Sequence, residues 1–236
     1  MSLIINPRGM SGAGKSWLVR EAMAAYRRRG AGAAPLCRAG RSRPIGWRLD
    51  HPWGSRLLAV IGHYEATRGG TDTIPLTDGG LDEVFRLTNA LAGDGHDVLF
   101  EGLQLSGEVE RTAALAREQR ARGGRLHVLC LDTPLSRCVQ NVMARRRVGQ
   151  AARPGIERAV QAGHAALVAA CESLRRSDAE VEALDAVAAL RRTLALLGID
   201  TTRGGELARQ APTRAAILQG LALTRSEPNR GPSGVK

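Results

Sequence analysis

The sequence has 236 residues, of which 43% are hydrophobic and only 3% aromatic, and its formal net charge is +11. This length predicts one domain with a sizeable core of Leu, Val, Ile and Ala, with or without a small appendage. No uninterrupted apolar run is long enough to span a bilayer, which excludes a transmembrane helix. The charge points to a polyanionic partner, although a general preference for arginine would produce the same charge without any function.

The chain begins with a predicted apolar strand at residues 3–6, a glycine-rich loop and a predicted helix at residues 17–29. The loop at residues 9–16 reads GMSGAGKS and fits the phosphate-binding pattern G-x-x-x-x-G-K-[ST], in the strand, loop and helix context that this pattern requires. A glycine-rich turn that happens to precede a helix is the alternative. We expect these residues to hold a nucleoside triphosphate: Gly9, Ser11, Gly12, Ala13, Gly14, Lys15, Ser16 and Trp17.

The use of lysine supports a phosphate-binding loop. Lys15 is the only lysine before the terminal Lys236, and every other basic position is arginine. A chain with this bias keeps lysine where a compact ammonium is needed and a guanidinium fork is unsuitable. In a loop of this kind the lysine reaches the β- and γ-phosphates, and the hydroxyl that follows it, here Ser16, ligates Mg²⁺.

After the first helix, the pattern of short strands and turns predicts a small hairpin insertion at about residues 34–62 that leads into a core strand. Polar side chains, rings and two adjacent glycines follow that strand directly. In α/β proteins, ligands bind at such strand ends. Five residues are therefore candidates for substrate contact: His63, Tyr64, Gly70, Thr71 and Asp72. A packed His-Tyr pair would show the same pattern.

The chain then alternates helices with strands. We predict further strands at residues 96–102, 125–131 and 181–184, and helices at residues 81–91, 109–122, from 134 to the arginines at 145–147, 156–174 and 186–197. Asp132 and Thr133 are expected to cap the helix that has Pro134 at its first position. This alternation implies an α/β three-layer sandwich with a mainly parallel sheet.

The predicted domain covers residues 1–198, and residues 199–236 are expected to form one helix, around 213–223, and a disordered tail. Cys37, Cys130, Cys138 and Cys171 show no C-x-x-C pair and no spacing suited to zinc. We therefore expect four reduced thiols in a cytoplasmic protein. No basic and apolar leader precedes the first strand, which leads to the same expectation of a soluble protein without a membrane partner.

The stretch from Leu131 to Val139, continuing to the arginines at 145–147, resembles the strand, helix and lid of small P-loop kinases related to polynucleotide and gluconate kinases. The resemblance covers about residues 1–198 and implies a P-loop NTPase fold, with ATP and Mg²⁺ as cofactors. It also implies an arginine-rich lid at about residues 144–155, whose Arg145 and Arg146 close over the transferring phosphates. A solvated helix C-terminus is the alternative interpretation of these arginines.

A narrower resemblance is to phage kinases that phosphorylate 5-hydroxymethyluracil in DNA, a step toward base hypermodification. Four stretches carry it, in this order: Pro44-Ile45-Gly46-Trp47, Val60-Ile61-Gly62-His63-Tyr64-Glu65, Gly69-Gly70-Thr71-Asp72-Thr73-Ile74 and Phe100-Glu101-Gly102-Leu103. It implies DNA as the substrate and the host cytoplasm as the location. Arg41 and Arg43 would then contact the DNA backbone, and His63 and Tyr64 would hold the extracted base.

Phosphoryl transfer to a hydroxyl also needs a base for the acceptor proton. Asp72 and Glu101 compete for this role; we favour Asp72 as the base and Glu101, with Ser16, as the residue that orients the magnesium ion and its waters. Each carboxylate could instead be a structural cap. The alternatives to a DNA kinase are a kinase of a nucleoside, nucleotide or other small hydroxyl compound, and a regulator that binds nucleotide without transferring phosphate. The sequence leaves the oligomeric state open.

Overall fold

The computed structural model describes residues 2–37, 44–65 and 69–199. All of them belong to one compact unit, residues 1–200. The predicted helix around 213–223 lies outside the described residues, as do Arg41 and Arg43. Within the described residues the chain forms seven strands: β1 Leu3–Arg8, β2 Ala33–Leu36, β3 Gly46–Leu49, β4 Leu58–Ile61, β5 Asp97–Phe100, β6 Arg125–Leu131 and β7 Glu180–Leu184.

The seven strands form one sheet in the order β2-β3-β4-β5-β1-β6-β7. Strand β3 runs opposite to the other six strands, which are parallel to one another. The predicted α/β class with a mainly parallel sheet is therefore confirmed. The short strands β2 and β7 form the two edges. The carboxyl ends of β4, β5, β1 and β6 meet at the same edge of the sheet, because these strands are parallel to one another. Loops that follow such strand ends are where α/β proteins place their sites.

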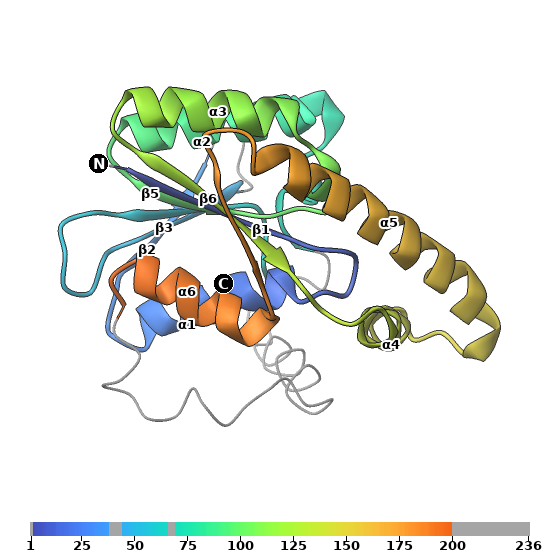
Figure 1. Ribbon diagram of the computed structural model, residues 1–236. Helices are drawn as coiled ribbons and strands as arrows, with labels where there is room; N and C mark the ends of the chain where they lie inside the picture. The colour runs from blue at the N-terminus through green and yellow to red at the C-terminus, as the bar shows by residue number, and fades with distance from the viewer. Residues whose placement is uncertain (1, 38–43, 66–68, 200–236) are drawn as a thin grey trace, which may run out of the picture. The chain divides into compact units, whose positions relative to one another are not determined.

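Helices cover both faces of the sheet (Figure 1). The α-helices of the described residues are α1 Lys15–Arg27, α2 Gly80–Gly93, α3 Glu110–Ala121, α4 Leu135–Arg146, α5 Arg153–Leu174 and α6 Ala186–Leu196. In Figure 1, α2 and α3 lie above the sheet and α1 and α6 below it, which gives three layers. An apolar cluster joins the α2 and α3 face to the sheet, with Val84, Leu115, Val98 and Phe100 among its buried side chains.

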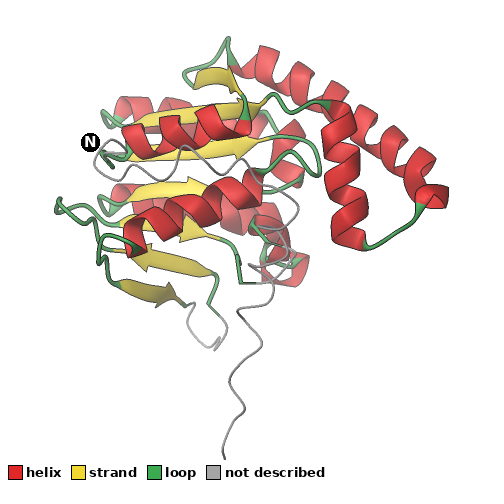
Figure 2. Cartoon of the chain, turned by 90° about the horizontal axis from the view of Figure 1, so that it is seen from below, coloured by secondary structure: helices red, strands yellow, loops and turns green. Residues whose placement is uncertain are grey.

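Helices α4 and α5 pack against each other and project beyond the carboxyl ends of the strands (Figure 2). Helix α4 begins one residue later than predicted, and Pro134 occupies its N-cap position without a side-chain cap. The expected cap by Thr133 is wrong, because its hydroxyl donates instead to the carbonyl of Ala13, at 2.9 Å, in the loop between β1 and α1. The end of β6 is thereby tied to that loop.

Cys130 in β6 and Cys171 in α5 form a disulfide, so the prediction of four reduced thiols is wrong for this pair. The two residues are 41 positions apart in the sequence and meet because α5 packs over the sheet. Neither belongs to a short spacing pattern, which is why the sequence offered no signal for the pairing. Cys37 and Cys138 are free thiols, the first exposed and the second buried.

Candidate active site

The loop between β1 and α1 is closely packed against α4. Gly12 and Gly14 have φ values of 86° and 103°, a region that favours glycine. A Cβ atom on Gly12 would lie 2.4 Å from the backbone oxygen of Cys138 in α4, so a larger residue would displace the helix or the loop. Asn141, also in α4, donates from Nδ2 to the carbonyl oxygen of Gly12 at 2.9 Å. These contacts fix the loop in one conformation.

Lys15, the first residue of α1, folds back onto this loop. Its Nζ atom donates to the carbonyl oxygen of Gly9 at 2.5 Å and to that of Met10 at 3.2 Å. Burial lowers the pKa of Lys15, and the carboxylates of Glu101 and Asp72 oppose that shift. The predicted lysine therefore lies where the carbonyls of the loop hold it in place, with both predicted acids close enough to act on its charge.

Glu101 follows β5, the neighbour of β1, and it is only 2% exposed. Its Oε1 atom accepts a hydrogen bond from Ser16 Oγ at 2.8 Å. Burial raises the pKa of Glu101, while the charge of Lys15 and the Ser16 hydroxyl act in the opposite direction. Two predicted metal ligands, separated by 85 positions in the sequence, thus lie side by side, and both present oxygen atoms, the donors that Mg²⁺ prefers.

Asp72 lies beside Glu101, because the turn at residues 70–73 packs on the end of β5. The backbone N–H of Thr71 donates to the carbonyl oxygen of Glu101 at 2.8 Å. The Asp72 carboxylate is exposed and accepts from the backbone N–H groups of Leu103 at 2.6 Å and Gln104 at 3.2 Å. Asp72 therefore caps the turn that follows β5, and it also faces the same site as Lys15 and Glu101.

His63 and Tyr64 lie directly after β4 and pack against the turn at residues 70–73. The backbone N–H of Gly70 donates to the carbonyl oxygen of His63 at 2.8 Å, and the Tyr64 hydroxyl donates to that of Ile61 at 3.3 Å. Both side chains are buried, and burial raises the pKa of Tyr64 well above its usual value. Arg20 of α1 donates from Nε to the carbonyl oxygen of Tyr64 at 2.8 Å. This geometry favours the packed interpretation of the pair over stacking on an extracted base.

The end of α4 brings one of the predicted lid arginines to the loop. Arg145 donates from its guanidinium to Ser11 Oγ at 2.9 Å. Arg146 is also exposed, and because neighbouring residues of a helix point about 100° apart, its side chain leaves α4 from a different face than that of Arg145. Arg147 ends the helix in the left-handed conformation, with φ 57°. Of the two predicted lid arginines, Arg145 is thus the one with a described contact to the loop.

Sequence reasoning missed two residues that hold the loop from the other side. Arg8, fully buried directly before Gly9, donates to the carbonyl oxygen of Glu108 and, at 2.5 Å, to Thr112 Oγ1. Burial lowers its pKa to about 10, and Glu108 opposes the shift. Ser106 donates to the carbonyl oxygen of Gly9 at 2.8 Å. The only available signal for Arg8 was its place between the predicted strand and the glycine-rich loop, and Ser106 had none.

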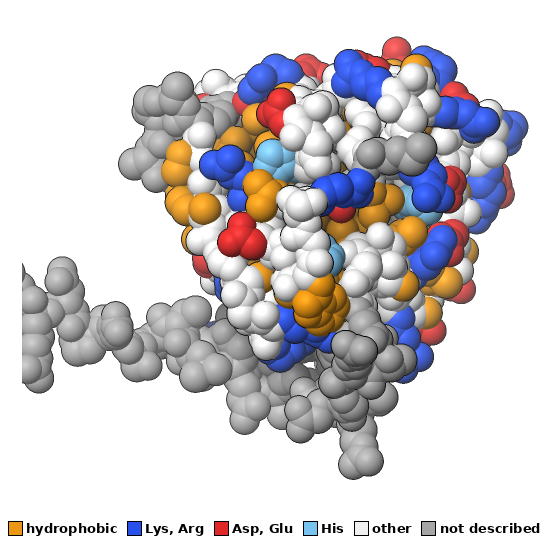
Figure 3. Space-filling view, turned by 90° about the vertical axis from the view of Figure 1, so that its left-hand side faces the viewer, with side chains coloured by type: hydrophobic (Ala, Val, Ile, Leu, Met, Phe, Trp, Pro, Cys, Tyr) orange, Lys and Arg blue, Asp and Glu red, His pale blue; other side chains and the backbone are white. Residues whose placement is uncertain are grey.

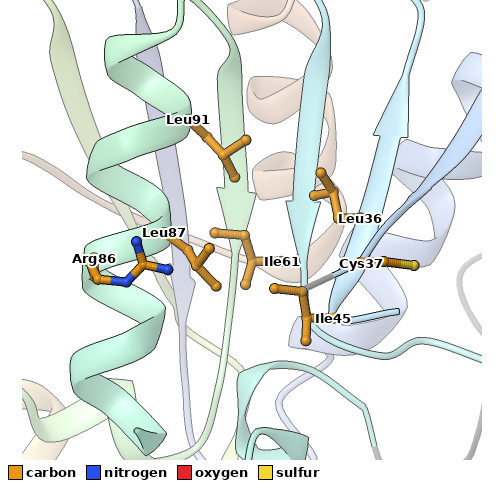
Figure 4. A pocket seen from close by; sticks show the side chains of 7 residues that line it. All are labelled: Leu36, Cys37, Ile45, Ile61, Arg86, Leu87 and Leu91. Atoms are coloured by element: carbon orange, nitrogen blue, oxygen red, sulfur yellow. The ribbon is translucent and has the colours of Figure 1, made fainter. Parts of the chain in front are cut away.

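One cavity of the described residues, of about 230 Å³, lies apart from this site, between α2 and the part of the sheet formed by β2, β3 and β4 (Figure 4). Figure 4 shows a mainly apolar lining with the guanidinium of Arg86 at one side. None of the residues predicted to act on nucleotide or substrate lines it: Leu36, Cys37, Ile45, Ile61, Arg86, Leu87 and Leu91. The candidate active site is therefore the loop region and not this cavity.

No protein-family model matches the chain. A search of curated proteins found a relative, "5-hmdU DNA kinase" of Pseudomonas phage PaMx11, that is 37% identical over 153 residues, which is 65% of this chain and 74% of the relative. The chain belongs to the family of this 5-hmdU DNA kinase. The resemblance to this kinase group that the sequence motifs indicated is thus confirmed. Among the described residues of this family member, no helix has both the length and the apolar character needed to cross a membrane.

Proposed function

We propose that this protein transfers the γ-phosphate of ATP to the hydroxymethyl group of 5-hydroxymethyluracil in DNA. The observation that carries the proposal is the 37% identity to a 5-hmdU DNA kinase over 74% of that relative. The site supports it from the chemical side: one phosphate-binding loop meets an ammonium, a hydroxyl, two carboxylates and a guanidinium, which are the groups that phosphoryl transfer requires.

In this proposal the loop and its neighbours hold the donor. The loop at residues 9–16 and the N-terminus of α1 hold the phosphates, and Lys15 leaves the loop carbonyls to contact the β- and γ-phosphates. Ser16 and Glu101 hold Mg²⁺, which neutralises charge on the transferring group when it is bound. Arg145, already in contact with Ser11, supplies a further positive charge there.

The acceptor lies on the Asp72 side of the site. Asp72 takes the proton of the hydroxymethyl group as its oxygen forms a bond to the γ-phosphorus, and the bond from that phosphorus to the β-γ bridging oxygen breaks. Gly70 and Thr71 line the approach, and His63 and Tyr64 hold this turn in place. Arg41 and Arg43 remain sequence predictions for contacts with the DNA backbone. We retain residues 1–198 as the kinase domain, with a hairpin insertion at 34–62 and a lid at 144–155.

Charge supports a polyanionic acceptor but does not define one surface. On the face shown in Figure 3, basic and acidic side chains lie interspersed with apolar ones. Several arginines of the described residues are paired with carboxylates, for example Arg111 with Asp82 at 2.7 Å and Arg86 with Glu83 at 2.7 Å. Charge that is already paired contributes less to DNA binding. We therefore leave the contacts with DNA to Arg41 and Arg43, as the sequence predicts.

The acceptor is tested with two DNA duplexes of one sequence that differ only in carrying 5-hydroxymethyluracil or thymine. With labelled ATP, we expect transfer to the first duplex and none to the second, because the thymine methyl group has no hydroxyl. Binding to DNA should also fall with salt, with a log-log slope of about −0.9 for each phosphate contacted. Free nucleosides and oligonucleotide 5′ ends complete the panel.

The outcome separates the alternatives. Salt-insensitive turnover of a free nucleoside, with none on the modified duplex, would replace the proposal by a small-molecule kinase. Binding of MgATP with no transfer to any acceptor in the panel would favour a nucleotide-binding regulator.

Arg145 and Arg146 provide a matched pair of lid variants. Arg145→Ala should lower kcat about 100-fold, because it removes a charge that contacts the loop; this is the lower end of the range seen for single donors to developing charge. Arg146→Ala, one residue along the exposed end of α4, should leave kcat within about twofold, since its side chain leaves the helix from a different face. Steady-state kinetics on the modified duplex checks both values. Equal losses in the two variants would mean that the lid acts through its net charge alone.

A further inference from the structure

The carbonyl oxygen of Gly9 has two hydrogen-bond donors. Lys15 Nζ lies 2.5 Å from it and Ser106 Oγ lies 2.8 Å from it. Ser106 also accepts from the backbone N–H of Gly9, at 3.3 Å, so its hydroxyl pairs with both polar groups of this glycine. The other carbonyl that holds Lys15, that of Met10, likewise has a second donor, the backbone N–H of Ala13 at 3.1 Å.

Gly9 lies where water cannot replace a lost donor. The residue is buried, and a Cβ atom on it would lie 2.8 Å from Cβ of Ala13 and 3.3 Å from Cβ of Leu131. A buried carbonyl that loses its only donor incurs the full cost of desolvation. If Lys15 moves to the phosphates, Ser106 is the group that keeps the Gly9 carbonyl paired, while the backbone of Ala13 does the same for Met10.

Ser106 is held rigidly enough for this role. It is 4% exposed, and it lies in the 3-10 turn η3 Gln104–Gly107. The residues that follow this turn are tied to β1 by Arg8, which donates to the backbone of Glu108 and to the side chain of Thr112. The consecutive residues Arg8 and Gly9 thus both contact the segment at residues 106–112. The position of Ser106 relative to Gly9 is fixed from both sides.

We infer that Ser106 is a positioning residue for nucleotide binding: it takes over the Gly9 carbonyl and thereby releases Lys15 for the phosphates. The inference rests on the proposed function only in its second half, the movement of Lys15 to a nucleotide. Its first half, a carbonyl shared by Lys15 and Ser106, concerns the protein without nucleotide. The two halves can be measured separately.

The first experiment is a double-mutant cycle on stability without nucleotide, by urea unfolding of Ser106→Ala, Lys15→Ala and the double variant. Each single variant leaves one donor on the Gly9 carbonyl, whereas the double variant leaves none. We expect the unfolding midpoint of the double variant to fall by clearly more than the sum of the two single shifts. Additive shifts would overturn the shared carbonyl, and the inference with it.

The second experiment measures Kd for MgATP by titration and kcat at saturating ATP. Ser106→Ala should weaken MgATP binding about tenfold, because the release of Lys15 then leaves a buried acceptor unpaired. Once the nucleotide is bound, Lys15 occupies the same place, so kcat should stay within about twofold. Ser106→Cys, close in size but a weaker donor, should give an intermediate Kd and serves if the alanine variant does not fold.

Ser177→Ala is the matched control, since the Ser177 hydroxyl also donates to a backbone carbonyl, that of Leu174 at 2.7 Å, outside the candidate site. It should cost some stability and leave Kd unchanged. A wild-type Kd in both Ser106 variants, with MgATP bound normally by the wild-type protein, would overturn the inference and leave the proposed function standing. Failure of the wild-type protein to bind MgATP would instead end both the proposed function and the release of Lys15.

Discussion

Replacing Lys15 by alanine should abolish phosphate transfer while leaving the fold intact. The ammonium is the compact charge that reaches the β- and γ-phosphates, and removal of one such group from a preorganised site lowers kcat about 1,000-fold. The cost in stability should be small, because both carbonyls that accept from Lys15 keep another donor, Ser106 Oγ for Gly9 and the N–H of Ala13 for Met10. Turnover of labelled ATP and urea unfolding measure the two effects.

Lys15→Arg tests why this arginine-rich chain keeps a lysine here. The side chain of Lys15 is only 7% exposed and is enclosed by the loop, where a planar guanidinium is larger than the ammonium it would replace. We expect this variant to lose most activity as well.

For the alanine variant, the contradicting outcome is clear. Wild-type turnover in Lys15→Ala would rule out the proposed kinase chemistry.

Asp72→Asn and Glu101→Gln should both lower kcat, and they should differ in their response to magnesium. Loss of a general base costs about 100- to 10,000-fold in rate. Asp72→Asn should show such a loss with unchanged MgATP affinity. It should also lower stability by about 1 kcal/mol, since one of the two oxygens that accept from backbone N–H groups becomes an NH2 donor. Glu101→Gln keeps an acceptor for Ser16 but loses the charge beside it.

The measurement is kcat against Mg²⁺ concentration at fixed ATP. Glu101→Gln should lower kcat about 100-fold and require more Mg²⁺ for half-maximal rate, whereas the magnesium dependence of Asp72→Asn should match that of the wild type. If Asp72→Asn retains most of its activity, the carboxylate is a cap of the turn at residues 103–104 and no more. Glu101 would then be the candidate base.

The elements of the sheet could be predicted because local sequence determines them. The run at residues 125–131 is mainly apolar, as expected for a strand covered on both faces, and β6 has these same bounds. The loop at residues 9–16 could be predicted as a phosphate site because its glycines, lysine and serine are all within eight consecutive residues. Glu101 was identifiable as the polar residue at the end of an apolar strand.

Other features depend on contacts between distant parts of the chain and leave no local pattern. The disulfide between Cys130 and Cys171 forms because α5 covers the sheet, and the Ser106 contact with Gly9 spans 97 positions. Asp72 had the sequence environment of an acid in a ligand loop, and only the fold shows that it also caps a turn 31 positions away. Tyr64 is a comparable case, since an exposed ring and a packed one have the same neighbours in sequence.

The two edge strands of the sheet bear on how this protein behaves at high concentration. An open edge exposes unpaired N–H and C=O groups and can recruit a strand from another copy, which is a common route to aggregation. Here β2 has four residues and includes Pro35, which lacks an N–H, and β7 carries the acidic side chains of Glu180 and Glu182. Proline and charged side chains on an edge strand both oppose the addition of a further strand. We therefore expect these edges to resist edge-to-edge polymerisation of the folded protein, although its sheet is not closed into a barrel.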